Sequence, residues 1–240
     1  MRLGTACMLV AALAAPMALG GEGKIKVLVV TGGHGFNRDA FFAIFKDNPE
    51  IEWTEGKQGK TSTAYDREDL LDFDVVFCYD MVQGITDVQK KAFLSLFEKG
   101  IGLVVNHHAL ASYQAWPEFE KAVGGKFLLR PEKQGDKTIP KSGTGGGKLT
   151  IHVEAKNHPI AQGLSDYELH DEYYNRCRVS PDVTLVLTTD CPGNNREICW
   201  CREHGKSRVV YLMSGHDNKV YSDANHRKVI ANAIRWAARR

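Results

Sequence analysis

The sequence has almost no net charge and no block of basic residues. Its 240 residues include 31 Lys and Arg against 29 Asp and Glu, which gives a formal net charge of +2 at pH 7. Nucleic-acid-binding domains carry a basic patch or stripe, and no stripe of basic residues interleaved with aromatic ones occurs here. The composition therefore argues against nucleic acid and favours a small-molecule partner.

Long apolar runs are also absent after the first twenty residues. Residues 1–20 combine a charge at Arg2, an alanine-rich apolar core from Cys7 to Ala15 and small residues up to Gly20. This pattern is typical of a secretory signal peptide, because the core is too short to span a bilayer; a frayed N-terminal helix is the alternative. We therefore expect a secreted or periplasmic protein. No later run reaches about 18 apolar residues, so we expect no membrane contact after cleavage.

Cysteines are few, and none is spaced as Cys-x-x-Cys, so thiol–disulfide catalysis is not indicated. One lies in the predicted signal peptide, and Cys78 lies in an apolar run. The other four are Cys177, Cys191, Cys199 and Cys201. An exported chain meets oxidising conditions, so we expect one or two disulfides among these four, with the pairing left open. A structural zinc site is the alternative, although the spacing fits no zinc-finger pattern.

From Lys24 onward, apolar strands alternate with amphipathic helices. The predicted strands cover residues 25–30, 75–79, 101–105, 149–153, 183–188, 198–202 and 209–213, and the predicted helices follow Asn37, Thr86 and Asp223 and cover residues 113–123. Residues 131–148 are polar and rich in glycine, and we expect a mobile loop there. The pattern predicts one domain over residues 24–240. Its fold class is α/β, a three-layer sandwich with a mostly parallel central sheet and an antiparallel extension.

Four segments end an apolar run and then present histidine. They are residues 32–35, 106–108, 170–172 and 215–217. In an open, mostly parallel sheet the carboxyl ends of the strands share one edge, and ligands bind in the crevice there. We therefore expect these distant segments to meet at one functional site.

The first segment, Gly32-Gly33-His34-Gly35, lacks both the G-x-G-x-x-G order of a dinucleotide site and the Lys of a phosphate loop. Its glycines would allow a ligand to approach the backbone closely. We predict that Gly33 and His34 bind substrate. A tight strand-to-helix turn that simply needs glycine is the alternative.

The second segment, Asn106-His107-His108, lies where an α/β hydrolase or an amidotransferase holds its nucleophile on a sharp turn. Neither Ser nor Cys occupies the turn, which disfavours covalent acyl chemistry. One of the two histidines, His108 in preference to His107, is predicted to act as a general acid or base or as a metal ligand. A capping or core role is the alternative.

The third segment, His170-Asp171-Glu172-Tyr173, is the densest cluster of functional groups in the chain. If it is extended, His170 and Glu172 face one side and Asp171 faces the other. We predict catalytic roles for all three together with His108. Tyr173 offers a flat, amphipathic surface on which a sugar ring can pack. A solvated charged turn is the alternative.

The fourth segment contains His216 and Asp217, and Asp217 is predicted to bind substrate, with helix capping as the alternative. Mixed imidazole and carboxylate ligands suit a divalent metal such as zinc. If such a metal is bound, the first candidate ligands are His34, His170, Glu172 and His216. The remaining histidines are placed outside the site, His158 in a turn and His204 and His226 on the exposed surface.

Several ordered motifs together resemble the ThuA-like (trehalose utilisation) family. They are GGHGF at residues 32–36, Trp116-Pro117-Glu118-Phe119, residues 157–160, 170–173, 205–209 and 215–217, and the closing residues 234–238. The resemblance covers nearly all of the chain after the predicted signal peptide. It implies a class I glutamine amidotransferase-like fold that lacks the cysteine nucleophile, and the late cysteines are additions to the family pattern.

The resemblance also implies a role with trehalose-like or oxidised (keto) sugars. Our leading hypothesis is an exported carbohydrate-active enzyme that uses acid–base chemistry, with metal assistance if a divalent ion is bound. Hydrolysis, elimination and isomerisation stay open, as does the oligomeric state. A sugar-binding module without catalysis is the alternative, and a glutamine amidotransferase is disfavoured by the missing nucleophile.

Overall fold

The computed structural model describes residues 23–240, so the predicted signal peptide lies outside the described residues. None of the helices in this part is long and apolar enough to cross a membrane. The strands are β1 (Ile25–Gly32), β2 (Ile51–Lys57), β3 (Val75–Asp80), β4 (Gly102–Asn106), β5 (Gly125–Lys126), β6 (Glu132–Gln134), β7 (Lys137–Ile139), β8 (Gly143–Val153), β9 (Tyr167–Asn175), β10 (Arg178–Val179), β11 (Thr184–Thr189), β12 (Glu197–His204) and β13 (Ser207–Leu212). The α-helices are α1 (Arg38–Lys46), α2 (Asp87–Lys99), α3 (Pro117–Val123), α4 (Asn218–Ser222) and α5 (Ala224–Ala237), and short 3₁₀ helices are η1 (Thr63–Asp66), η2 (Leu70–Asp72), η3 (His107–Ala111) and η4 (Pro159–Ala161).

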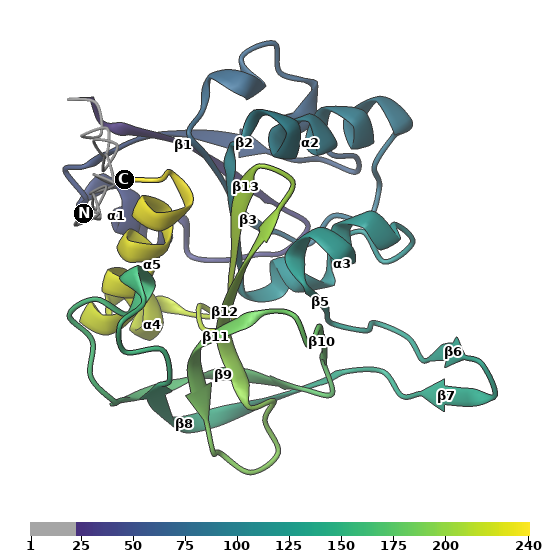
Figure 1. The fold of residues 1–240 in the computed structure, drawn as a ribbon, viewed down its shortest axis with the longest axis vertical. Coiled ribbons are helices and arrows are strands. Elements are labelled where there is room, and N and C mark those ends of the chain that lie inside the picture. The colour runs from purple at the N-terminus through teal and green to yellow at the C-terminus, as the bar shows by residue number, and fades with distance from the viewer. Residues whose placement is uncertain (1–22) are drawn as a thin grey trace, which may run out of the picture.

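One nine-stranded sheet organises the molecule, in the order β2-β1-β3-β4-β13-β12-β11-β8-β9 (Figure 1). The strands from β2 to β13 pair in parallel, and those from β13 to β9 pair antiparallel. This confirms the predicted parallel sheet with an antiparallel extension. Strands β1, β3, β4 and β13 of the parallel part are buried on both faces, so they are nearly continuous apolar runs.

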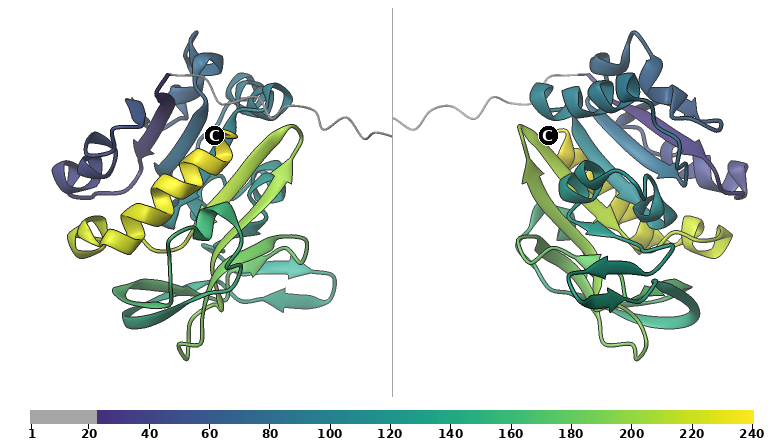
Figure 2. Two further views of the ribbon diagram at one scale, coloured as in Figure 1. Left: turned by 60° about the vertical axis from the view of Figure 1, so that its left-hand side comes forward. Right: turned by 90° about the vertical axis from the view of Figure 1, so that its right-hand side faces the viewer.

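Helices cover both faces of the parallel half (Figure 2). Helix α4 contacts both α1 and α5, and α5 packs on β4 and β13. Helices α2 and α3 contact β13 from the other side. The result is the three-layer sandwich that the sequence predicts, with the carboxyl ends of β1, β3, β4 and β13 at one edge.

Helix boundaries follow local signals. The capping box of Thr86 and Gln89 starts α2, and Gly100 ends it in the left-handed conformation. Val88, predicted on the buried stripe, is 73% exposed. The helix predicted over residues 113–123 begins only at Pro117, because a residue before proline favours an extended conformation and Trp116 adopts one.

The predicted mobile loop over residues 131–148 is wrong. It contains the β6–β7 hairpin, which projects from the body in Figure 1, and the first half of β8. The glycines of β8 leave room for aromatic rings of β9, since a Cβ on Gly145 would lie 2.5 Å from the ring of Tyr173. Strand β2, a polar edge strand, was not among the predicted strands.

The disulfide prediction is also wrong for the described residues, whose five cysteines are free thiols. Cys199 and Cys201 are buried on β12 and fill the core as small hydrophobic side chains. The Sγ atom of Cys201 lies 3.5 Å from Nε2 of His158, whose Nδ1 accepts the N–H of Ile160. The proton of neutral His158 is therefore on Nε2, so this imidazole cannot take a proton from Cys201 there.

Candidate functional site

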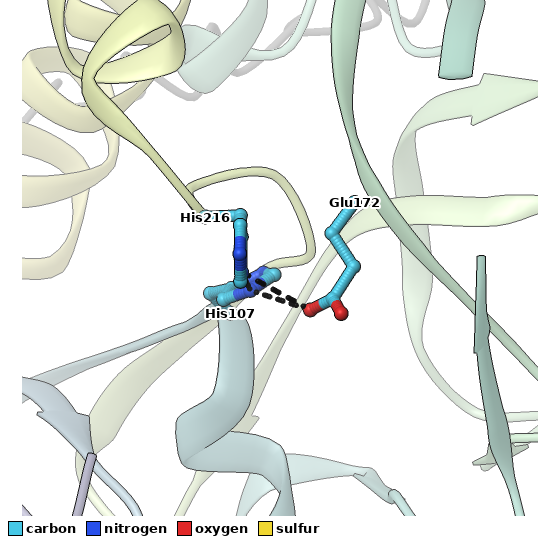
Figure 3. Close-up of side chains that lie close together, drawn as sticks. All are labelled: His107, Glu172 and His216. Carbon is cyan, nitrogen blue, oxygen red and sulfur yellow. Dashed lines mark hydrogen bonds and ion pairs between the residues drawn. The ribbon is translucent and has the colours of Figure 1, made fainter. Parts of the chain in front are cut away.

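Histidines from three strand ends and a carboxylate from a fourth strand meet at the carboxyl edge of the sheet. His34 follows β1, His107 and His108 follow β4, and His216 follows β13. The ring centroids of His34 and His216 lie 6.3 Å apart, and those of His107 and His216 lie 5.4 Å apart. Glu172 of β9 points into the same place, as Figure 3 shows.

Three of these side chains form a nearly equilateral triangle. Oε2 of Glu172 lies 3.2 Å from Nε2 of His107 and 3.3 Å from Nδ1 of His216. The two imidazole nitrogens are 3.3 Å apart. Within residues 23–240 this is the group of histidine, cysteine and acidic side chains whose atoms converge closely enough to hold a metal ion.

A backbone contact fixes the tautomer of His107. Its Nδ1 lies 2.6 Å from the carbonyl oxygen of Met213, and because a carbonyl only accepts, Nδ1 carries the proton. In a neutral imidazole Nε2 then directs a lone pair toward the carboxylate of Glu172. Two acceptors at this distance require a positive group between them, which is either a proton or a metal ion.

The dimensions of the triangle suit a tetrahedral ion. Zinc bonds of about 2.0–2.1 Å place tetrahedral ligand atoms about 3.3–3.4 Å apart. Two histidines and one glutamate form a known ligand set of catalytic zinc sites, in which the fourth position stays open for water or substrate. Burial raises the pKa of Glu172, but the hydrogen bond with His107 and the charges of His107 and His216 outweigh it and hold that pKa below its usual range.

The end of β4 is tied to the end of β13 by buried polar contacts. His107 itself has a φ of 52°, a left-handed conformation at the turn where related folds present a nucleophile. The amide of Asn106 donates to the carbonyls of Leu212 and Ser214, and the hydroxyl of Tyr211 donates to the carbonyl of His107. These contacts fix the backbone on both sides of the triangle.

Asp171 anchors the segment that carries His216. It is 4% exposed, and its carboxylate accepts the N–H groups of Gly215, His216 and Glu172 at 2.7, 3.1 and 2.8 Å. Burial raises the pKa of this carboxyl, against the lowering effect of His107 and the backbone donors. The structure therefore places Asp171, predicted as catalytic, in a position to orient its neighbours.

His108 lies behind the triangle. Its ring is between His34 and Tyr79, with centroid distances of 4.4 and 4.3 Å, and it is 4% exposed. Neither of its ring nitrogens makes a hydrogen bond of good geometry in the described part of the chain, although one of them contacts the backbone of Tyr79. Burial, followed by the charges of His107 and His34, lowers the pKa of His108 to about 2. The neutral ring suits hydrogen bonding better than the predicted acid–base role.

His170 does not join this group. It is exposed on β9, in register with Lys148, while Leu169 and Asp171 are buried. The strict alternation expected for an extended segment breaks after Asp171, because the next buried residue is Tyr174. Asp171 and Glu172 therefore both reach the segment at residues 215–216. His107, which the sequence placed second to His108, takes the position expected of His170.

The predicted substrate-binding residues have mixed positions. His34 is exposed beside the triangle, and Gly33 has a φ of 71° in a turn where a Cβ would lie 2.7 Å from the backbone of Met81. The carboxylate of Asp217 caps α4 by accepting the N–H groups of Lys219 and Val220 at 2.9 and 3.4 Å. Tyr173 is partly buried over the glycines of β8.

Two buried titratable residues, Asp80 and His226, were not predicted from the sequence. Asp80, at the end of β3, accepts from the amide of Gln58 at 3.1 Å, and burial raises its pKa to about 7. His226, predicted to be exposed, is 0% exposed and contacts Ser214, with a ring nitrogen 3.2 Å from the hydroxyl. Helical spacing from His226 to Ile230 and Ala233 could have revealed its inward position. His204 is half-buried against Phe97, whereas His158 lies in the predicted turn.

Fold and site together define a class of protein: an α/β protein with a class I glutamine amidotransferase-like fold, in which a histidine occupies the turn after β4. The family model described as ThuA, trehalose utilisation, matches residues 26–237. The chain therefore belongs to the ThuA family.

Solved structures agree on the fold. A ThuA-like protein from Parabacteroides merdae is 19% identical, with a TM-score of 0.75 over 90% of each chain. A ThuA-like protein from Bacteroides uniformis is 20% identical, with a TM-score of 0.65 over 93% of this chain and 95% of that one. PurLQS from Thermotoga maritima is 15% identical, with a TM-score of 0.58 over 89% of this chain and 99% of that one. No curated protein matches the chain.

Proposed function

We propose that this protein is a divalent-metal-dependent enzyme that acts on a small, neutral carbohydrate. The observation that carries the proposal is the triangle of His107, Glu172 and His216, whose three acceptor atoms are 3.2–3.3 Å apart. We propose zinc or a similar ion as the metal, because this ligand set and these distances suit it.

The charges around the triangle support both a divalent ion and a neutral substrate. The carboxylates of Asp171 and Glu172 balance a doubly positive ion. In residues 23–240 no Lys or Arg side chain forms a hydrogen bond or ion pair with either of them. A phosphate or carboxylate substrate is usually held by an arginine or lysine clamp. A substrate that offers only hydroxyl groups needs no such clamp. The family description, trehalose utilisation, agrees with a sugar.

A bound metal would polarise an oxygen of the substrate. His107, Glu172 and His216 would hold the ion, and Asp171 keeps His216 in place through its backbone. His34 is the exposed imidazole beside the triangle, so we assign it the exchange of a proton with a hydroxyl or with a carbon next to a carbonyl. Such a positioned group contributes roughly 10²–10⁴ in rate.

Metal binding tests the proposal directly. Isothermal titration of the metal-free protein with Zn²⁺ is expected to show one site, which His107→Ala and Glu172→Gln both lose. His152→Ala is the matched control, because His152 also contacts a carboxylate, with its Nδ1 2.9 Å from Asp166, but lies elsewhere, half-buried on β8. A wild-type protein without a Zn²⁺ site, or variants that retain it, would overturn the proposal.

Turnover is tested with the metal-loaded protein on trehalose and on its keto derivative, followed by product analysis. We expect conversion that disappears in Glu172→Gln. Saturable binding without any product would instead make the protein a sugar-binding module. We also propose that the chain is exported through residues 1–20, which the mass of the mature protein from its own host checks.

A further inference from the structure

His108 is the buried side chain of this site that lacks partners. An imidazole always offers at least one hydrogen-bonding atom, and buried polar groups in native proteins are nearly always paired. Both ring nitrogens of His108 are buried without a hydrogen bond of good geometry in the described residues, and a contact with the backbone of Tyr79 can satisfy only one of them, while His107 next to it uses both of its nitrogens. A group left in this state at a candidate active site points to a partner that a ligand supplies.

His34 covers this imidazole. The two rings are 4.4 Å apart and inclined by 30°, and His34 lies on the solvent side while His108 is buried. The His34 side chain has a local hydrogen bond with the backbone of Gly35 and no hydrogen bond to another segment of the described protein. It sits on a loop with Gly33 and Gly35, and a Cβ on Gly35 would have no neighbour within 4 Å. The His34 side chain is itself exposed, so it can turn toward solvent.

His108 is also close to the triangle. Its ring centroid is 5.5 Å from that of His107, and His34 is within 6.3 Å of His216, so His34 borders both His108 and the triangle. A ligand oxygen that replaces the His34 ring over His108 would leave a neighbouring oxygen of the same molecule near His107, Glu172 and His216. A molecule with oxygens on adjacent carbons can offer one to each position, whereas a single hydroxyl reaches one position only.

We infer that His108 is a specificity-determining residue that hydrogen-bonds one of two adjacent oxygens of the substrate after the His34 side chain moves off the His108 ring to the side of the bound substrate. The ligand class is a neutral vicinal diol or hydroxycarbonyl compound. The inference rests on the proposed function for the second oxygen, which would lie at the metal triangle. It predicts that His34 controls access to His108.

Chemical modification with diethyl pyrocarbonate, mapped by peptide mass spectrometry on the metal-loaded full chain, tests access. In the wild type we expect His152 to react and His108 to stay unmodified. In His34→Ala, His108 should become modified, and myo-inositol, a ring of adjacent hydroxyls, should protect it better than cyclohexanol does. His226, equally buried but not covered by His34, should stay unmodified in both proteins.

An unmodified His108 in His34→Ala, or equal protection by both alcohols, would overturn the inference. A second variant checks the hydrogen bond: His108→Phe should bind myo-inositol about tenfold more weakly, the loss of one hydrogen bond, with unchanged Zn²⁺ affinity. Unchanged myo-inositol affinity would also overturn it. A wild type that binds no Zn²⁺ overturns the proposed function instead, so the two failures are distinguishable.

Discussion

The Nδ1 atom of His107 donates a hydrogen bond to the carbonyl of Met213 over 2.6 Å, and this contact decides which nitrogen faces Glu172. It joins the end of β4 to the end of β13, which are neighbours in the parallel part of the sheet. The turn after β4, where a nucleophile would stand in an acyl-transfer enzyme, thus presents a lone pair to the centre of the site. The same position in the fold would serve the metal site that we propose, and it holds no nucleophile for covalent chemistry.

Asp171 should control metal affinity without touching the metal. Asp171→Asn replaces one acceptor oxygen by an amide group that faces the N–H donors of Gly215 and His216, so the backbone of His216 shifts. Loss of such a supporting carboxylate typically weakens metal binding about 10–100-fold. Titration with Zn²⁺ measures this. Asp166→Asn is the control, since Asp166 contacts only His152 and Val153, and equal affinity of the two variants would contradict the prediction.

The inner strands of the parallel sheet were predictable because each is a continuous apolar run in the sequence. The strand from Val75 to Tyr79 is buried on both faces, so its prediction does not depend on an alternation of apolar and polar residues. The β6–β7 hairpin was missed because its short strands are polar and pair only with each other. The glycine-rich half of β8 was missed because it is stabilised by pairing with β9, which is distant in the sequence. Glycines that look like a loop in sequence make space for Tyr173 in the fold.

The location of the candidate site was predictable from the sequence, but the residues that form it were predictable only in part. Glycine and histidine after apolar runs indicated the strand ends, which the sheet brings together. The choice between His107 and His108 depends on backbone conformation, since a left-handed residue at the turn directs one ring outward and the other into the core. The position of His170 depends on where β9 loses its alternation, and tertiary packing sets that point.

Gly33 should be intolerant of any side chain, whereas Gly35 should accept one. Gly33→Ala would place a Cβ 2.7 Å from the backbone of Met81 at a φ of 71°. Such strain costs roughly 1–3 kcal/mol. Gly35→Ala meets nothing within 4 Å and should change stability by less than about 0.5 kcal/mol. Urea unfolding of both variants compares them, and similar midpoints would show that the turn can relax.

His226 should make the protein less stable in acid. Burial lowers its pKa to about 3 from an unfolded value of 6.5. Between these values the unfolded chain binds the proton and the folded chain does not, so stability falls as pH drops below 6.5. The loss from pH 7 to pH 5 is about 2 kcal/mol. His226→Asn keeps a polar group near Ser214 but cannot titrate, so its acid slope should be flatter.

Unfolding free energies of both proteins from pH 7 to pH 5 give the two slopes. His152→Asn is the control, because the hydrogen bond to Asp166 raises the pKa of His152, so its removal cannot flatten the acid slope. Parallel curves for the wild type and His226→Asn would mean that the folded protein protonates this ring as easily as the unfolded chain does.

Asp80 should stabilise the protein in acid, which is opposite to the effect of His226. Burial raises its pKa to about 7, far above the unfolded value of 3.8. Between these two values the folded protein holds the proton and the unfolded chain has lost it, so this contribution to stability is full below 3.8 and disappears as pH rises to 7. The total is about 4 kcal/mol. Because this term opposes that of His226 below pH 6.5, the wild-type curve alone cannot separate them.

The difference between Asp80→Asn and the wild type isolates the Asp80 contribution. An amide cannot ionise, so the variant should gain stability relative to the wild type as pH rises from 4 to 7 and keep that gain up to pH 8. Asp136→Asn, at an exposed turn between β6 and β7, should show no such trend. A constant difference between Asp80→Asn and the wild type would mean that Gln58 and Tyr113 stabilise the carboxylate enough to cancel the effect of burial.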